Sequence, residues 1–143
     1  MANTFSREIL ADGYRNAVVK ISGVLDTADA SLAPAVSLTD FVNNDNVMGK
    51  LSGLRVDHIW HSMGNGIEML LTWDATVQQQ IAAVAARGRE TFIGVGGLKP
   101  NMLALGFSGD INLLTTGFNV QGPGPQNFTL LLEMIKLYRQ VVQ

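Results

Sequence analysis

The stretch Arg55–Asp74, RVDHIWHSMGNGIEMLLTWD, contains two runs in which apolar and polar side chains alternate, separated by a glycine-rich segment. Such alternation is typical of β-strands whose two faces meet different surroundings. One face of the first run holds Leu54, Val56, His58 and Trp60, and one face of the second holds Ile67, Met69, Leu71 and Trp73. The intervening SMGNG has the composition of a tight turn. The stretch therefore predicts a β-hairpin with one apolar and one polar face.

Charge favours one register of this predicted hairpin. A turn at Asn65-Gly66 would set Asp57 opposite Asp74, and two carboxylates in that position repel each other. A turn at Gly64-Asn65 avoids this, and opposed pairs of compatible side chains contribute roughly 0.2–1 kcal/mol each. The pairs that the second register predicts are Arg55 with Asp74, His61 with Glu68, Val56 with Trp73, His58 with Leu71, and Trp60 with Met69. We therefore expect both tryptophans to point inward.

The same stretch holds both histidines of the chain and three carboxylates. On a strand, His58 and His61 are three residues apart and point to opposite faces, so they do not share a metal ion. The carboxylates of Asp57, Glu68 and Asp74 lie on the predicted polar face. We expect ion pairs on a strand surface there, in preference to a pair of catalytic carboxylates.

No other motif carries chemistry. The segment Gly94–Asn101, GVGGLKPN, fits neither glycine-rich phosphate-binding pattern, and no serine stands in a G-x-S-x-G context. The chain has no cysteine, which excludes disulfides, thiolate metal sites and cysteine nucleophiles. The sequence thus predicts a protein that is not an enzyme and has no catalytic residue, metal site or cofactor.

Composition bounds the class of protein. The chain has 143 residues, of which 47% are hydrophobic and only 15% charged, with a net charge of −2. These values predict one packed domain spanning residues 1–143, and they make nucleic acid and anionic membranes poor partners. The N-terminus, MANTFSREIL, places Arg7 and Glu8 where a signal peptide needs an apolar run. We expect synthesis in a cytoplasm.

Fifteen glycines divide the chain into short pieces, as in an all-β protein. Residues 16–25 read as a strand with Val19 and Ile21 on one face. Two segments, 78–86 and 128–142, fit a strand or a helix equally well, although the residues after the first favour two short strands around a break. Residues 1–15 lack strand alternation and are predicted to form an N-terminal arm. Its large apolar side chains are Met1, Phe5, Ile9 and Leu10.

Four pieces of the chain point to a family. They are the opening MANTFSREILADGYRNAVVKISGVLDTAD, WDAT at residues 73–76, RG at 87–88 followed by GGL at 96–98, and the closing FTLLLEMIK. Together they resemble the capsid decoration, or cement, proteins of tailed bacteriophages. The resemblance implies a jelly-roll-like β-sandwich with a structural role on the virion exterior. It also implies the major capsid protein as partner, and strands at 78–86 and 128–142.

The C-terminal segment also bears on assembly. As a strand it carries apolar residues on both faces, because Leu131, Ile135 and Leu137 lie opposite the face of Phe128 and Leu130. A chain with few charges to guard its sheet edges is expected to cover them with partner chains. We therefore expect a homo-oligomer, a dimer or trimer. The predicted interface residues are Phe5, Ile9, Leu10, Ile135 and Leu137.

Two other functions are compatible with this sequence. One is a different structural role in the phage particle, as a tail-tube or neck component. The other is a carbohydrate-binding sandwich that uses Trp60 or Trp73 as a stacking platform. Exposure of the tryptophans distinguishes the second alternative, because the expected hairpin register buries both rings.

Overall fold

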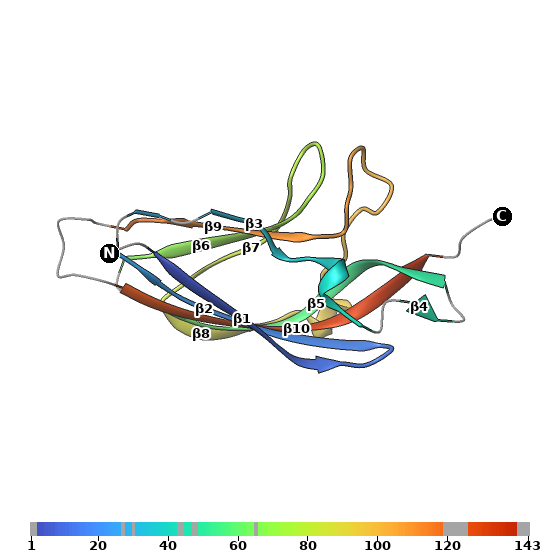
Figure 1. The fold of residues 1–143 in the computed structure, drawn as a ribbon, viewed down its shortest axis with the longest axis horizontal. Helices are drawn as coiled ribbons and strands as arrows, with labels where there is room; N and C mark the ends of the chain where they lie inside the picture. The colour runs from blue at the N-terminus through green and yellow to red at the C-terminus, as the bar shows by residue number, and fades with distance from the viewer. Residues whose placement is uncertain are drawn as a thin grey trace.

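Two antiparallel sheets stack face to face in a computed structural model of the chain (Figure 1). The structure describes residues 3–26, 28–29, 31–42, 45–46, 49–64, 66–118 and 126–139. The strands of sheet A are β1 (Thr4–Asp12), β2 (Asn16–Leu25), β4 (Asp45–Asn46), β5 (Gly49–Met63), β8 (Arg87–Thr91) and β10 (Gln126–Arg139). Those of sheet B are β3 (Ser31–Val36), β6 (Glu68–Trp73), β7 (Gln79–Ala85) and β9 (Ile111–Thr116). Two short 3₁₀ helices, η1 (Leu38–Asp40) and η2 (Ile93–Val95), interrupt the connections.

The order of the strands is that of a jelly roll. In sheet A the sequence of neighbours is β2-β10-β5-β8, and in sheet B it is β3-β9-β6-β7. The chain therefore changes sheet after β2, β3, β5, β7, β8 and β9, which is the connectivity of eight-stranded double-sheet jelly rolls. β1 adds an extra strand beside β2. The all-β, jelly-roll-like β-sandwich expected from the sequence is confirmed.

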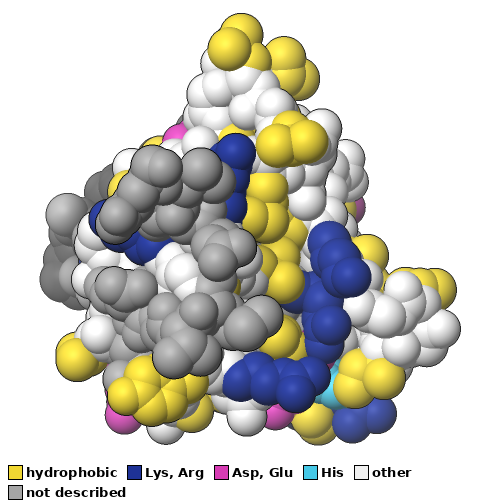
Figure 2. Space-filling view, turned by 90° about the vertical axis from the view of Figure 1, so that its right-hand side faces the viewer, with side chains coloured by type: hydrophobic (Ala, Val, Ile, Leu, Met, Phe, Trp, Pro, Cys, Tyr) yellow, Lys and Arg dark blue, Asp and Glu magenta, His cyan; other side chains and the backbone are white. Residues whose placement is uncertain are grey.

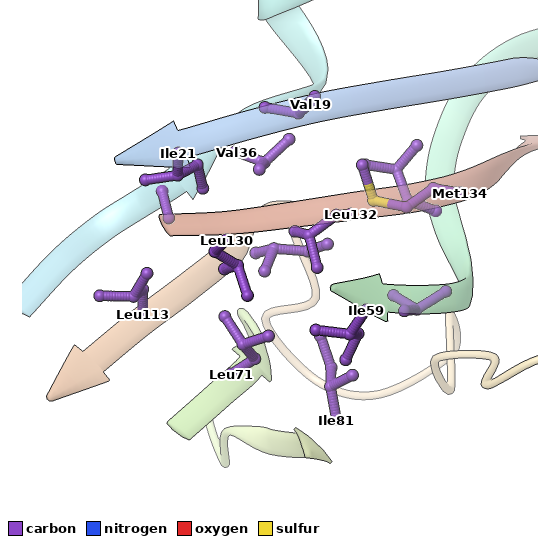
Figure 3. Packing of buried hydrophobic residues seen from close by; sticks show 14 of the residues in the cluster. Val19, Ile21, Val36, Ile59, Leu71, Ile81, Leu113, Leu130, Leu132 and Met134 are labelled. Atoms are coloured by element: carbon purple, nitrogen blue, oxygen red, sulfur yellow. The ribbon is translucent and has the colours of Figure 1, made fainter. Parts of the chain in front are cut away.

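The core lies between the sheets and follows from strand alternation. In β2, Ala17, Val19 and Ile21 are buried, while Lys20 and Ser22 point outward, as predicted. Sheet B contributes the opposing apolar side chains. Figure 3 shows Ile59, Leu130, Leu132 and Met134 of sheet A packing against Val36, Leu71, Ile81 and Leu113 of sheet B. Burial of these side chains is the main stabilising contribution to the fold.

The predicted hairpin does not form. β5 pairs with β10 and β8, whereas β6 pairs with β7 and β9 in the other sheet, so the connection between β5 and β6 crosses from one sheet to the other. Asn65, in the predicted turn, lies outside the described residues. Both segments are strands, as their alternation indicated. Alternation shows that a strand has two different faces, but it does not identify the neighbouring strand.

A β-bulge at Asp57 reverses the expected faces of β5 beyond that residue. Glu133 of β10 pairs with His58, and the next residue pairs with Val56, so Asp57 has no opposite residue in β10. The Asp57 carbonyl instead accepts a hydrogen bond of 2.8 Å from the Phe92 N–H. An inserted residue shifts the alternation by one. Trp60 consequently points outward, against expectation, and Ile59 points into the core.

The ambiguous segments are all strands. β7 covers 79–85, β8 begins at Arg87, and the break between them is at Ala86, whose φ of 59° is left-handed. β10 runs to Arg139, and residues 140–142 of the predicted segment lie outside the described residues. Its inward residues are Phe128, Leu130, Leu132, Met134 and Lys136.

Residues 4–12 of the predicted N-terminal arm form a β-strand, which the sequence did not indicate. β1 pairs antiparallel with β2 from Thr4 to Asp12, with an irregularity between Ile9 and Ala11. Sequence alternation missed this strand because it has no fully buried face: every β1 side chain is exposed or half-buried. β1 therefore extends the edge of sheet A and adds little to the core. Whether it also acts as an arm in an assembly stays a prediction.

Candidate functional site

An open apolar groove lies on the outer side of sheet A, along the C-terminal end of β10. Ile135 and Leu137 both line it, and they lie on the face opposite the inward residues, as predicted. Its other lining side chains include Tyr14, Pro100 and Met102, and its volume is about 580 Å³. Two of the five predicted interface residues thus share one concave surface. We call this surface the β10 groove.

Positive charge borders the β10 groove. Arg15 and Lys99 are among its lining residues, and no acidic residue lines it among those that the structure describes. The ammonium of Lys136 is neutralised by Asp12 and lies 4.9 Å from the centre of the Phe41 ring. The groove therefore suits a partner that combines apolar and acidic side chains.

Arg55 lies on β5, opposite Ile135 of β10. Its guanidinium is held by an ion pair with Asp57. Its Nε lies 2.9 Å from Asp57 Oδ1 and its Nη2 lies 3.1 Å from Oδ2. Hydrogen bonding to Asp57, reinforced by the carboxylate charge, raises the pKa of Arg55. This two-point contact holds the guanidinium beside its own strand.

The other three predicted interface residues lie on β1. Phe5, Ile9 and Leu10 are 38%, 40% and 48% exposed. The Phe5 ring sits 6.1 Å from the ring of Phe128, so it partly covers the end of the core. None of these three residues lines the β10 groove, although Asp12 at the end of β1 pairs with Lys136, which does.

The two tryptophans have different environments, contrary to the expectation that both are inside. Trp73 is buried, and its Nε1 donates to the Leu54 carbonyl at 3.1 Å. Trp60 is 42% exposed, and the Arg89 guanidinium carbon lies 4.8 Å from the centre of its ring. Trp60 also lines a second outer groove of about 490 Å³, together with Leu131 and Thr129.

The histidines point to opposite sides, but the assignment of their faces was reversed. His61 is buried, with Nδ1 3.4 Å from the Ala86 carbonyl oxygen and Nε2 3.5 Å from Glu90 Oε1. His58 lies on the outer side, opposite Glu133. No group of three or more metal-ligating side chains occurs in the part of the chain that the structure describes.

The three carboxylates of the opening stretch do not converge. Asp57 binds Arg55 on β5, Glu68 begins β6 in the other sheet, and Asp74 follows β6 in a loop. The predicted pairs of Arg55 with Asp74 and His61 with Glu68 are therefore wrong, because their strands belong to different sheets. This separation leaves no pair of these carboxylates placed for acid–base catalysis.

The sequence analysis missed a projection built from two loops. Residues 74–78 connect β6 to β7, and residues 101–109 precede β9; both loops extend beyond sheet B, side by side at the top of Figure 1. We call them together the knob. Its most exposed apolar side chains are Val77, Leu103 and Leu105, which are 80%, 83% and 82% exposed. Figure 2 shows hydrophobic side chains at the apex of the molecule.

Hydrogen bonds between the loops hold the knob together. The Thr76 N–H donates to the Leu105 carbonyl at 2.9 Å, and the Gln79 side chain bonds the backbone of Asn101 in both directions, at 2.7 and 3.0 Å. Gly106 has a φ of 74°, and a Cβ there would lie 2.2 Å from Thr76 Oγ1. The loops can approach this closely only because residue 106 is glycine.

Asp74 joins the bases of the two loops. Its Oδ2 accepts from Ser108 Oγ at 2.8 Å, and its Oδ1 accepts from Gln78 Nε2 at 3.0 Å and Asn112 Nδ2 at 3.2 Å. Hydrogen bonds from Gln78 and then Ser108 lower the pKa of Asp74, against a smaller opposing effect of burial. The signal in the sequence was that two segments, 75–86 and 100–109, contain no charged residue and include stretches with the composition of exposed loops.

No protein-family model matches the chain, and no curated protein matches it. Among solved structures, a cupin superfamily protein from Desulfitobacterium hafniense is similar, with 12% identity and a TM-score of 0.33 over 92% of this chain and 79% of the other. The jelly-roll assignment rests on the strand order and not on this likeness. No helix in the described part of the chain is long and apolar enough to cross a membrane.

Proposed function

We propose that this protein is a capsid decoration protein, which binds the outer surface of a tailed-phage head and stabilises the shell by bridging capsid subunits. The observation that carries the proposal is the β10 groove. It places the predicted interface residues Ile135 and Leu137 in an open, apolar, cation-bordered surface on the outside of a jelly-roll sandwich. Surfaces of this kind mark contacts between proteins.

The mechanism is thermodynamic. A protein that binds the assembled shell, and not its separated subunits, adds its binding free energy to the cost of opening the shell. On a lattice, many copies each bind a repeated site, so contacts that are weak individually hold firmly together. The partners in this proposal are the major capsid protein and other copies of the chain, in a dimer or trimer on the virion exterior.

Substitution of Ile135 by Glu tests the proposal. A carboxylate in the groove loses the apolar contact and must be desolvated in the interface, so binding should fall by about tenfold or more. Binding is measured by co-sedimentation with phage heads prepared without this protein. Leu114→Glu is the control, because Leu114 is a partly exposed residue on the outer face of sheet B.

The melting temperature separates binding from folding. Ile135 is only half-buried on the outside of the sheet, so Ile135→Glu should unfold close to the wild-type temperature while its binding falls. If wild-type protein is a monomer that does not sediment with heads, and Ile135→Glu simply unfolds, the decoration proposal is wrong.

The exposed Trp60 favours a second candidate, carbohydrate binding. Its ring lines the second outer groove beside the Arg89 guanidinium, and the residue is 42% exposed. Aromatic rings on β-sandwiches provide stacking surfaces for sugars. In that case Trp60→Ala would abolish binding to an oligosaccharide array, and oligosaccharide would quench tryptophan fluorescence. Wild-type protein that binds heads but no sugar rejects this alternative.

A further inference from the structure

The knob combines high apolar exposure with a fixed shape. Three aliphatic side chains, Val77, Leu103 and Leu105, are each at least 80% exposed. Surface aliphatic residues scattered singly are ordinary, but these three lie in two loops that are hydrogen-bonded to each other and project side by side beyond sheet B (Figure 1). Figure 2 shows hydrophobic side chains gathered at that apex. We call the three side chains the tip. The hydrogen bonds that join the loops hold the backbone that carries these side chains in place before any partner arrives. Less conformational entropy is therefore lost on binding.

Charge indicates what kind of partner the tip suits. No Lys or Arg occurs in residues 74–78 or 101–109, and the ionisable side chain in these loops is the acidic Asp74. Loops and helices that insert into anionic membranes carry basic residues beside their apolar ones. The tip is thus better suited to an uncharged apolar pocket on a protein than to a lipid surface.

The size of the tip indicates how that partner is arranged. A stable interface between two proteins takes about 20–30 residues from each side, whereas the knob offers three large apolar side chains. Alone, it is too small to hold a free dimer together. It is sufficient as an anchor where many copies bind one repeated surface, because simultaneous binding multiplies weak affinities.

We infer that the knob is a docking element whose tip, Val77, Leu103 and Leu105, inserts into an apolar, uncharged pocket repeated on a protein lattice. The inference rests on the proposed function, in which the lattice is the phage head. Bridging requires more than one contact surface on each molecule. The knob and the β10 groove supply two, since only Met102 of the knob residues lines that groove.

The test compares two triple variants for binding to heads prepared without this protein. In the knob variant Val77, Leu103 and Leu105 become Ser. In the control, three exposed aliphatic residues outside the knob become Ser: Val42, Ile93 and Val95, which are 87%, 58% and 76% exposed. Both variants should fold, because none of the six side chains is buried. Equal melting temperatures of the knob variant and the control establish that a difference in their binding is not due to unfolding.

The expected result is that wild type and control bind heads alike, while the knob variant loses about tenfold or more in affinity for each apolar side chain removed. Equal binding by the knob variant overturns the inference and leaves the proposed function standing. If wild type does not bind heads, both fall.

Two further outcomes identify a different occupant, and each overturns the inference. Concentration-dependent self-association that the knob substitutions abolish, measured by analytical ultracentrifugation, would assign the tip to a second copy of the chain. Co-flotation with vesicles of phosphatidylcholine and phosphatidylserine, lost in the knob variant, would assign it to a membrane.

Discussion

At the scale of single residues, Gly106 shows how one position controls the knob. Its φ of 74° is in the left-handed region, and a Cβ would approach within 2.2 Å of Thr76 Oγ1 and 2.9 Å of the Thr76 nitrogen. We expect Gly106→Ala to lower the free energy of unfolding by about 1–2 kcal/mol from backbone strain alone, with a further loss from the clash. Chemical denaturation monitored by fluorescence measures the change.

Gly94→Ala is the matched control for Gly106→Ala. A Cβ at Gly94 meets no atom within 4 Å, and its φ is not in the left-handed region. The substitution should leave the free energy of unfolding within about 0.5 kcal/mol of wild type. Equal stability of the two variants would show that the loops separate readily, and the knob would lose its fixed shape.

At the scale of secondary-structure elements, β10, β5 and the knob show which parts of the structure could be predicted from the sequence. In β10 the sequence pattern fitted a strand or a helix, and as a strand it carried apolar residues on both faces. The structure shows that Phe128, Leu130, Leu132 and Met134 share the inward face, together with Lys136. In β5 the reasoning from alternation failed beyond Asp57, because a bulge depends on a partner strand that is distant in sequence. The knob was missed for a related reason, since the hydrogen bonds that brace it join residues 22 to 34 positions apart in the sequence.

The brace of the knob should depend on pH. Hydrogen bonds from Gln78 and Ser108 lower the pKa of Asp74 in the folded protein, so the ionised carboxylate favours the folded loops. This stabilisation is fully present above the unfolded pKa, about pH 4, and is lost as pH falls through the lower folded value. The amides of Thr76 and Ser108, which bond across the loops, should lose protection from hydrogen exchange in that window.

Asp74→Asn removes the titrating group from the brace. In this variant the protection of the Thr76 and Ser108 amides, corrected for the intrinsic exchange rate, should be weaker and should not change between pH 5 and pH 3. The Val56 amide lies outside the knob and donates to the Leu98 carbonyl at 2.9 Å. Its protection reports any general loosening of the fold. A wild-type brace that is equally protected at both pH values contradicts the role of Asp74.

At the scale of the whole molecule, the structure distinguishes a jelly-roll sandwich with a buried core from three outer features that we propose as contact surfaces: the β10 groove, the knob and β1. The eight jelly-roll strands enclose the buried core, and β1 lies outside that set. Low charge made an assembled state a reasonable expectation from composition. The location of the proposed contact surfaces could not come from composition, because it depends on which strands lie at the sheet edges and which loops project.

Deletion of residues 2–10 tests whether β1 serves the fold or the assembly. β2 keeps its pairing with β10 on the other side, and Asp12, the partner of the buried Lys136, remains in the chain. We therefore expect the shortened protein to fold, because no β1 side chain is fully buried. Its melting temperature should be lower, because the pairing of β1 with β2 is lost. Its oligomerisation, measured by analytical ultracentrifugation, and its binding to heads should weaken.

A second variant distinguishes the strand from its side chains. Phe5→Ser, Ile9→Ser and Leu10→Ser together keep the backbone pairing of β1 with β2 but remove its exposed apolar surface. If β1 docks on a neighbouring copy through these side chains, the triple variant should lose assembly as the deletion does, because apolar burial drives most association. If the deletion unfolds the isolated domain instead, β1 is an integral part of sheet A, and the interface must be sought at the β10 groove and the knob.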